Sequence, residues 1–146
     1  MKLVVDASVA VKWFLPDSRR EPDADLAAAL LRAIGEGRVE LLQPPHWLAE
    51  VAAVIARLRP EIAAEAIDLL DSMELATAAD AELYKRASRL AQEFDQHLFD
   101  TLYHALALEH DALLVTADDR YLRKAGRLGN IVAFGQWTPP AGESRA

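Results

Sequence analysis

Short apolar runs alternate along the chain with longer segments of helical periodicity. Residues 3–5 lack the alternation of a strand with one solvent-facing side, so they predict a strand buried on both faces. Further short strands are expected over 39–43, 73–78, 112–116 and 131–134. The helical segments span residues 6–14, 24–37, 46–58, 59–73, 80–94, 97–110 and 117–126. Short strands that alternate with helices predict an α/β domain on a parallel sheet with right-handed crossovers.

Glycine and proline residues mark several helix ends. Gly35 and Gly37 end the helix over 24–37, because glycine readily adopts the conformation that closes a helix. Pro45 suits the first turn of the following helix. Pro60 lies either in the first turn of the helix after that or at a break between the two. We expect the Ala-rich helices on either side of Pro60 to form a hairpin at one side of the sheet.

Two helices show an apolar face with i, i+3, i+4, i+7 spacing. Over 97–110 the face comprises Phe99, Leu102, Tyr103, Leu106 and His110. Over 46–58 it comprises Trp47, Val51, Val54 and Leu58. We interpret Trp13, Trp47 and Trp137 as core or interface residues.

Composition indicates a single folded domain. The chain has 146 residues, 52% of them hydrophobic, and no cysteine, which excludes disulfides and thiolate metal sites. No apolar run approaches the ~20 residues of a membrane-spanning helix, and the N-terminus lacks a signal-peptide pattern. We therefore expect a cytoplasmic protein with no membrane partner. We expect residues 1–137 to form the domain and residues 138–146 a flexible tail.

The formal net charge of −7 is unlike that of a protein that binds nucleic acid by charge alone. The surplus of carboxylates instead suggests a site that holds a divalent cation, which reverses the local field. Asp6 and Asp118 each follow the carboxyl end of an apolar strand, where sites form in parallel sheets. If the two strands are neighbours, both side chains face one crevice. For either residue alone, a helix N-cap is at least as good an interpretation.

Two further acids are candidates because of their positions on helices. Glu50 falls on the border of the apolar face of its helix, at 100° per residue. Asp100 lies in the first turn of its helix, where the dipole alone stabilises a carboxylate. A cluster of four unpaired carboxylates repels itself unless a cation neutralises it. Hard oxygen ligands favour Mg²⁺ or Mn²⁺, and such an ion activates water and orients a phosphodiester.

Weaker candidates surround these four acids. Ser8 and Thr116 carry hydroxyls that orient a carboxylate or water, or else cap helices. Asp119 assists the metal or is simply solvated. His97 and His104 flank Asp100, and we favour packing or hydrogen bonding over metal ligation for both. The basic residues that could meet a phosphate backbone are Lys12, Arg120 and Arg123. Dinucleotide, P-loop and serine-hydrolase motifs are absent.

Three stretches, together with the order of the acidic residues in them, carry a resemblance to a known family. They are VVDASVAVKWF at the start, the Glu in PHWLAEVAAVI, FDTLYHALALEHDALLVTADDRYL near the end, and the D…E…D-x-x-Y-x-A-L-A…T-x-D order that links them. In these the chain resembles PIN-domain ribonucleases, and within them the VapC-type toxins of toxin–antitoxin pairs. The resemblance covers nearly the whole chain.

The resemblance implies a three-layer α/β/α fold with a short central parallel sheet, and an endoribonuclease that uses Mg²⁺ or Mn²⁺. By matching motifs, Asp6, Glu50, Asp100 and Asp118 are the expected catalytic acids, with Asp6, Asp100 and Asp118 as metal ligands. Thr116, Asp119 and Ser8 are secondary site residues. The expected partners are an RNA substrate, a cognate VapB-type antitoxin and a second copy of the chain.

Three alternatives remain open at this stage. One is a phosphoryl-transfer or phosphatase domain with Asp6 as nucleophile, although the second acid common in that chemistry is here Ser8. Another is a PIN-like module that binds without turnover. The last is an acidic interaction module in which every carboxylate is only a helix cap.

Overall fold

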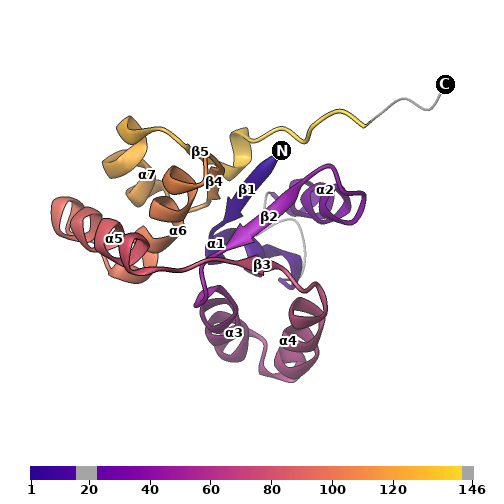
Figure 1. The fold of residues 1–146 in the computed structure, drawn as a ribbon. Helices are drawn as coiled ribbons and strands as arrows, with labels where there is room; N and C mark the ends of the chain where they lie inside the picture. The colour runs from indigo at the N-terminus through magenta and orange to yellow at the C-terminus, as the bar shows by residue number, and fades with distance from the viewer. Residues whose placement is uncertain (16–22, 143–146) are drawn as a thin grey trace.

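Within the described residues, 1–15 and 23–142, the computed structural model has a five-stranded sheet in the order β3-β2-β1-β4-β5. The strands are β1 (Lys2–Val5), β2 (Glu40–Gln43), β3 (Ala76–Thr77), β4 (Leu113–Thr116) and β5 (Ile131–Ala133). Each neighbouring pair is parallel. All five carboxyl ends therefore lie at the same edge of the sheet (Figure 1).

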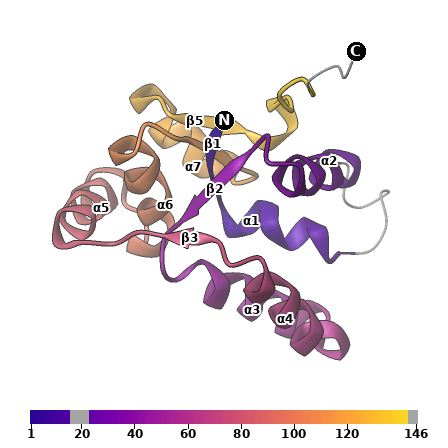
Figure 2. The same cartoon turned by 45° about the vertical axis from the view of Figure 1, so that its right-hand side comes forward.

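Helices surround the sheet. They are α1 (Ala7–Ala10), α2 (Ala24–Gly35), α3 (Trp47–Leu58), α4 (Ala63–Ser72), α5 (Ala81–Phe94), α6 (Leu98–Glu109) and α7 (Asp119–Ala125). Helices α1 and α2 lie on one side of the sheet and α5 and α6 on the other (Figure 2). Helices α3 and α4 pack against each other as a hairpin beside β3. The predicted parallel sheet, three-layer arrangement and lateral hairpin are confirmed.

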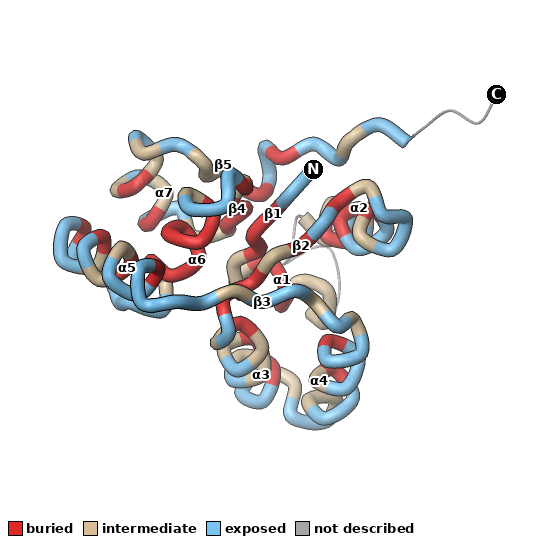
Figure 3. The backbone as a smooth tube through the Cα atoms, in the orientation of Figure 1, coloured by how far each residue is buried: buried red, intermediate tan, exposed pale blue. Residues whose placement is uncertain are grey.

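The core is centred on β1, β4 and α6. Leu3, Val4 and Val5 are completely buried, and so is nearly every residue in the middle of α6 (Figure 3). A strand with both faces covered needs no polar alternation. This explains why the short apolar runs predicted these strands correctly.

The predicted apolar faces of two helices are wrong at their ends. Phe99 is 56% exposed and His110 is also exposed, whereas residues 101–107 are buried on all sides. Helix α6 lies between the sheet and α5, so its middle has no solvent face. Leu58 is 52% exposed at the end of α3, where Ile55 is buried instead. The predicted core roles of Trp47 and Trp137 are confirmed.

Other boundaries differ from the predictions by a few residues. Pro60 is the first residue of a 3₁₀ turn, Pro60–Ile62, that separates α3 from α4. Of the two predicted roles, Pro60 therefore marks a break between the two helices. The strand predicted over 73–78 shortens to Ala76–Thr77. In the predicted tail, the Pro140 carbonyl accepts a hydrogen bond from Arg38 at 2.6 Å; residues 143–146 lie outside the described residues. None of the described helices has the length and apolar character needed to cross a membrane.

Candidate active site

Asp6 lies directly after β1, at the carboxyl edge of the sheet. It occupies the N-cap position of α1, yet its side chain makes no capping hydrogen bond. Its Oδ2 accepts hydrogen bonds from Ser8 Oγ at 2.6 Å and from Thr116 Oγ1 at 3.0 Å. The helix-cap interpretation is therefore wrong for Asp6. Its carboxyl is held by hydroxyls from α1 and from the end of β4.

The same two hydroxyls bind the loop between β4 and α7. Ser8 Oγ accepts from the Ala117 N–H at 3.0 Å, and Thr116 Oγ1 accepts from the Asp118 N–H at 3.0 Å. Because each hydroxyl accepts from a backbone N–H, its own proton is directed to Asp6. Of the two roles that the sequence left open for Ser8 and Thr116, these contacts match the orientation of a carboxylate.

Gln43 forms hydrogen bonds with the last residue of β1, directly before Asp6. Strands β1 and β2 pair only at Lys2 and Leu3, so Val5 has no backbone partner on that side. The buried side chain of Gln43 replaces this partner: its Oε1 accepts from the Val5 N–H at 2.9 Å, and its Nε2 donates to the Val5 carbonyl at 2.9 Å. Gln43 is not among the predicted site residues, because a glutamine at a strand end has no local signature.

Asp118 and Asp100 come from two other elements. Strand β4 pairs directly with β1, which confirms that Asp6 and Asp118 follow neighbouring strands. Asp118 does cap α7, since its Oδ1 accepts from the Tyr121 N–H at 3.0 Å. Asp100 lies in the first turn of α6 and its Oδ2 accepts from Gln96 at 3.4 Å. Asp6, Asp100 and Asp118 line one small cavity of about 10 Å³ with Leu114, Thr116 and Tyr121.

Glu50 approaches this cluster from α3. Its side chain is 31% exposed, and its Oε1 lies 2.9 Å from Nε2 of His46, the residue that precedes α3. Glu50 does not line the small cavity. Its negative charge nevertheless raises the pKa values of both Asp6 and Asp100. The four predicted acids therefore interact electrostatically, although only three of them share a cavity.

Burial is the main perturbation of Asp6. It raises the pKa of Asp6 to about 6 from the ordinary 3.8. The hydrogen bonds from Ser8 and Thr116 favour the ionised form and oppose this shift. The charges of Glu50 and Asp100 add to it. Asp6 is therefore about half protonated near pH 6, where an ordinary aspartate is fully ionised.

Asp100 is perturbed in the same direction. Burial raises its pKa first, and the charges of Glu50 and Asp118 raise it further. His97 and the hydrogen bond from Gln96 act in the opposite direction. Carboxyl groups whose pKa values are raised by burial and by like charges are typical of functional sites.

The same negative charges raise the pKa values of two neighbouring tyrosines. Tyr103 is completely buried, and its pKa lies above the usual range because of burial and then the charges of Glu50 and Asp6. Burial likewise raises the pKa of Tyr121, and Asp100 and Asp6 add to the shift. Both phenols therefore stay protonated at physiological pH.

An open groove of about 480 Å³ adjoins the cavity. It is lined by Asp95, Gln96, His97, Asp100, Asp118 and Arg120. Asp100 and Asp118 line both spaces, so the groove leads directly to the acids. The positively charged Arg120 and the hydrogen-bonding side chains of Gln96 and His97 thus lie along the approach to the acids.

The weaker candidate residues differ in burial and in hydrogen bonding. Asp119 is exposed in the first turn of α7. His97 is exposed beside the groove, whereas His104 is completely buried. Its Nε2 lies 2.8 Å from the Gly129 carbonyl and its Nδ1 lies 2.8 Å from the Tyr121 hydroxyl. Burial lowers the pKa of His104, so the ring is neutral and donates to the carbonyl. The prediction that His104 packs and hydrogen-bonds is confirmed.

The donor set fits a hard divalent cation, because carboxylate oxygens are the ligands that Mg²⁺ and Mn²⁺ prefer. Among the described residues, the buried Oε1 of Glu50 has no partner beyond its 2.9 Å contact with His46 Nε2. Among the described residues, no group of three or more His, Asp or Glu side chains lies close enough together to hold a metal ion as placed. Mg²⁺ commonly keeps several waters and binds through one or two carboxylates, so this arrangement is compatible with it. The assignment of Asp6, Asp100 and Asp118 as ligands stays a prediction.

Fold and site together define an α/β domain whose acids gather at the carboxyl edge of a five-stranded parallel sheet. The family model described as PIN domain matches residues 3–128, and the chain therefore belongs to the PIN domain family. PIN domains are generally metal-dependent nucleases, so the fold is that of a nuclease. A search of curated proteins found no match.

Proposed function

We propose that this protein is a Mg²⁺- or Mn²⁺-dependent endoribonuclease that acts as the toxin of a type II toxin–antitoxin pair. One observation carries the nuclease proposal: Asp6, Asp100 and Asp118 come from three elements far apart in sequence and line one cavity beside an open groove. Glu50 adds its charge from a fourth element. Family membership supports the reaction class.

The acids supply what phosphodiester hydrolysis requires of the protein. When bound, the divalent ion supplies an activated water and stabilises the leaving oxygen. Asp6, kept in one orientation by Ser8 and Thr116, presents its remaining carboxylate oxygen as a ligand. Asp118 has one oxygen in a helix cap and its other oxygen available. Neither residue has to act as a covalent nucleophile.

The groove accounts for how an acidic protein accepts RNA. Arg120 and His97 line it beside Asp100 and Asp118, and a guanidinium binds phosphate by paired hydrogen bonds. The bound cation offsets part of the carboxylate charge at the point where the phosphate must approach. Local charge at the site, rather than the net charge of −7, then governs binding.

The toxin role rests on the resemblance to VapC-type proteins and on the acidic site. A VapB-type antitoxin that inserts an Arg or Lys side chain among the acids would neutralise them in place of the metal. We also propose a homodimer and a cytoplasmic location, as for the proteins that the chain resembles. A pull-down of the natural partner, followed by RNA cleavage with and without it, tests the inhibitory role.

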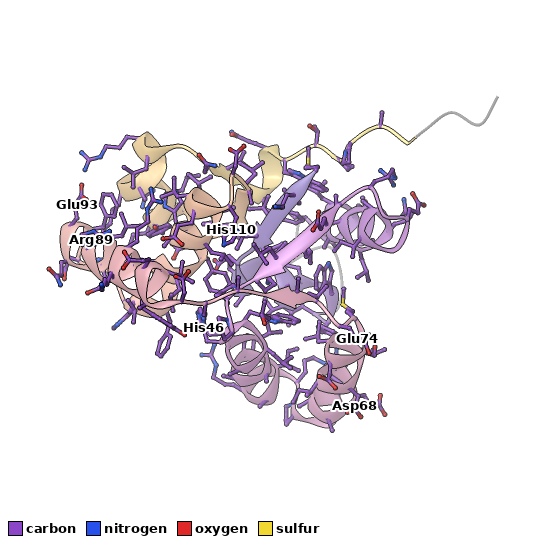
Figure 4. The ribbon with its side chains drawn as sticks, viewed as in Figure 1. His46, Asp68, Glu74, Arg89, Glu93 and His110 are labelled. Carbon is purple, nitrogen blue, oxygen red and sulfur yellow. The ribbon has the colours of Figure 1, made fainter. Side chains whose placement is uncertain are left out.

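The deciding experiment is cleavage of a total-RNA pool by purified protein with Mg²⁺, Mn²⁺ or EDTA. The expected result is fragments that require the metal and disappear in Asp6→Asn. Asp68→Asn is the matched control, because Asp68 is exposed on α4, on the helical hairpin (Figure 4). Its activity is expected to equal that of the wild type.

Two outcomes would contradict the proposal. Equal cleavage with EDTA and with Mn²⁺ would refute metal dependence. Full activity in Asp6→Asn would remove Asp6 from the site. Failure of the wild type to bind Mn²⁺ in a calorimetric titration would instead favour a binding module without turnover.

A further inference from the structure

His46 connects two elements that carry site acids. It precedes α3 (Figure 4), and it lies four residues before Glu50. Its Nε2 lies 2.8 Å from the Phe99 carbonyl oxygen, in the first turn of α6, and 2.9 Å from Glu50 Oε1. Phe99 immediately precedes Asp100. A single nitrogen thus contacts Glu50 and the backbone that positions Asp100.

The chemistry of the contact determines where the proton lies. A carbonyl oxygen only accepts hydrogen bonds, so Nε2 of His46 carries the hydrogen and donates to Phe99. This holds for the neutral ring and for the imidazolium, because both forms can carry a proton on Nε2. Glu50 Oε1 lies 2.9 Å from the same nitrogen, so the imidazole contacts the Glu50 carboxylate directly.

Two aromatic rings hold the imidazole in this orientation. The Phe99 ring centroid lies 5.2 Å away at an interplanar angle of 33°, and the Tyr103 centroid lies 4.9 Å away at 59°. Both aromatic residues belong to α6. Rotation of His46 would disturb both ring contacts, so the N–H has one preferred direction.

Two buried polar atoms lie at this contact. His46 Nδ1 has no hydrogen-bond partner among the described residues, and Glu50 Oε1 has none there beyond its 2.9 Å contact with His46 Nε2. Buried polar atoms are normally paired, and leaving one unpaired costs stability. The Glu50 carboxylate is therefore held beside His46 while it can still accept further hydrogen bonds.

We propose that His46 is a positioning residue that fixes Glu50 relative to Asp100 and leaves the Glu50 carboxylate free to act. The proposal rests on the metal-dependent nuclease function proposed above. His46 itself touches neither the small cavity nor the groove. Its effect passes through Glu50 and through the backbone of Phe99.

Two substitutions separate the N–H group of His46 from its ring. His46→Phe keeps an aromatic ring between Phe99 and Tyr103 but removes the donor. His46→Gln removes the ring and places an amide N–H near the position of Nε2. His110→Gln is the control, since His110 is exposed at the far end of α6.

The measurements are Mn²⁺ affinity by calorimetry, and kcat and KM on a short mixed-sequence RNA oligonucleotide carrying a fluorophore and a quencher. Loss of a group that orients a site residue typically costs ~10–100-fold in metal affinity or activity. We therefore expect His46→Phe to lower kcat by about 10–100-fold with KM unchanged, because other residues line the groove. His46→Gln is expected to recover most of this loss.

A third measurement does not depend on catalysis. Urea midpoints of His46→Phe, Glu50→Gln and the double variant, in EDTA, form a double-mutant cycle. If His46 contacts Glu50 as described, the two changes in midpoint do not add. A residue that served only the core would lower the midpoint and the active fraction together, and Gln would not rescue it.

Several results would overturn the proposal. Wild-type kcat and Mn²⁺ affinity in His46→Phe would do so, and so would equal losses in His46→Phe and His46→Gln. A wild type that neither binds Mn²⁺ nor cleaves RNA would refute the nuclease function instead. The urea double-mutant cycle would then test only the contact between His46 and Glu50. Additive changes in the unfolding midpoints would overturn this contact, and non-additive changes would support it.

Discussion

Replacing Asp6 with asparagine is expected to stabilise the metal-free protein near pH 8, although it removes a proposed catalytic residue. Asparagine has nearly the same shape, and its Oδ1 can accept the hydrogen bonds that Ser8 and Thr116 donate at 2.6 and 3.0 Å. The substitution therefore removes a buried negative charge and little else. Residues selected for activity often cost stability in this way.

The magnitude follows from the pKa of Asp6, which is about 6 in the folded protein against an ordinary 3.8. This shift of roughly two units corresponds to about 3 kcal/mol, at 1.36 kcal/mol per unit. Because the folded-state value is raised, the neutral carboxyl contributes stability that is complete below pH 3.8. That stability is lost as the pH rises through about 6.

Thermal unfolding of both proteins in EDTA, at about pH 4 and about pH 8, measures this difference. At 2–4 °C per kcal/mol for a domain of about this size, Asp6→Asn should gain roughly 6–12 °C relative to the wild type between the two pH values. Other titrating groups are common to both proteins and largely cancel. Asp68→Asn, at an exposed position, should show no such gain.

The reasoning would be refuted if the two proteins changed in parallel with pH. It would also be refuted if Asp6→Asn were the less stable protein near pH 8. Either result would mean that the hydroxyls of Ser8 and Thr116 compensate fully for burial of the charge. The pKa of Asp6 would then be close to its ordinary value, and its charge would not destabilise the folded protein.

Three further predictions concern the supports of the site and its ligand. Gln43→Met leaves the N–H and carbonyl of Val5 unpaired, so it should cost about 1–3 kcal/mol for each group; the drop in melting temperature should be absent in Gln92→Met, which alters an exposed glutamine. Thr116→Val removes a hydrogen bond that favours ionised Asp6, so NMR titration should show a still higher pKa for Asp6. Mn²⁺ at ~100 times its Kd should stabilise the wild type by about 2.7 kcal/mol near pH 8. This stabilisation should fade below about pH 5, where Asp6 is protonated. An unchanged Mn²⁺ effect at low pH would contradict the role of Asp6 as a ligand.

Much of the fold followed from local pattern. The apolar runs at β1 and β4 are recognisable because both faces of those strands are covered, so hydrophobicity alone marks them. The parallel arrangement then places Asp6 and Asp118 at one edge without knowledge of any contact. The same logic failed for α6, where periodicity predicted a buried Phe99 and the helix is instead buried through its middle.

The supporting contacts could not be predicted in this way. The amide of Gln43 pairs with Val5 because β1 and β2 separate after their first residues. His46 meets Phe99 because α3 and α6 converge at the carboxyl edge of the sheet. Both partners are distant in sequence, and no periodicity within one element encodes them.

Local patterns in the sequence were enough to predict the succession of strands and helices, the class of fold, and the positions of the four acids at element ends or, for Glu50, on the border of a helix face. These are consequences of side-chain chemistry acting over one or two turns of chain. Contacts between distant elements establish that Asp6 is held by hydroxyls rather than serving as a cap, and that Asp118 does serve as one. The folded structure likewise shows that Glu50 lies beside His46. The pKa of a carboxyl depends on burial and on charges that arrive from other elements, so the chemistry of the site exists only once the sheet has brought them together.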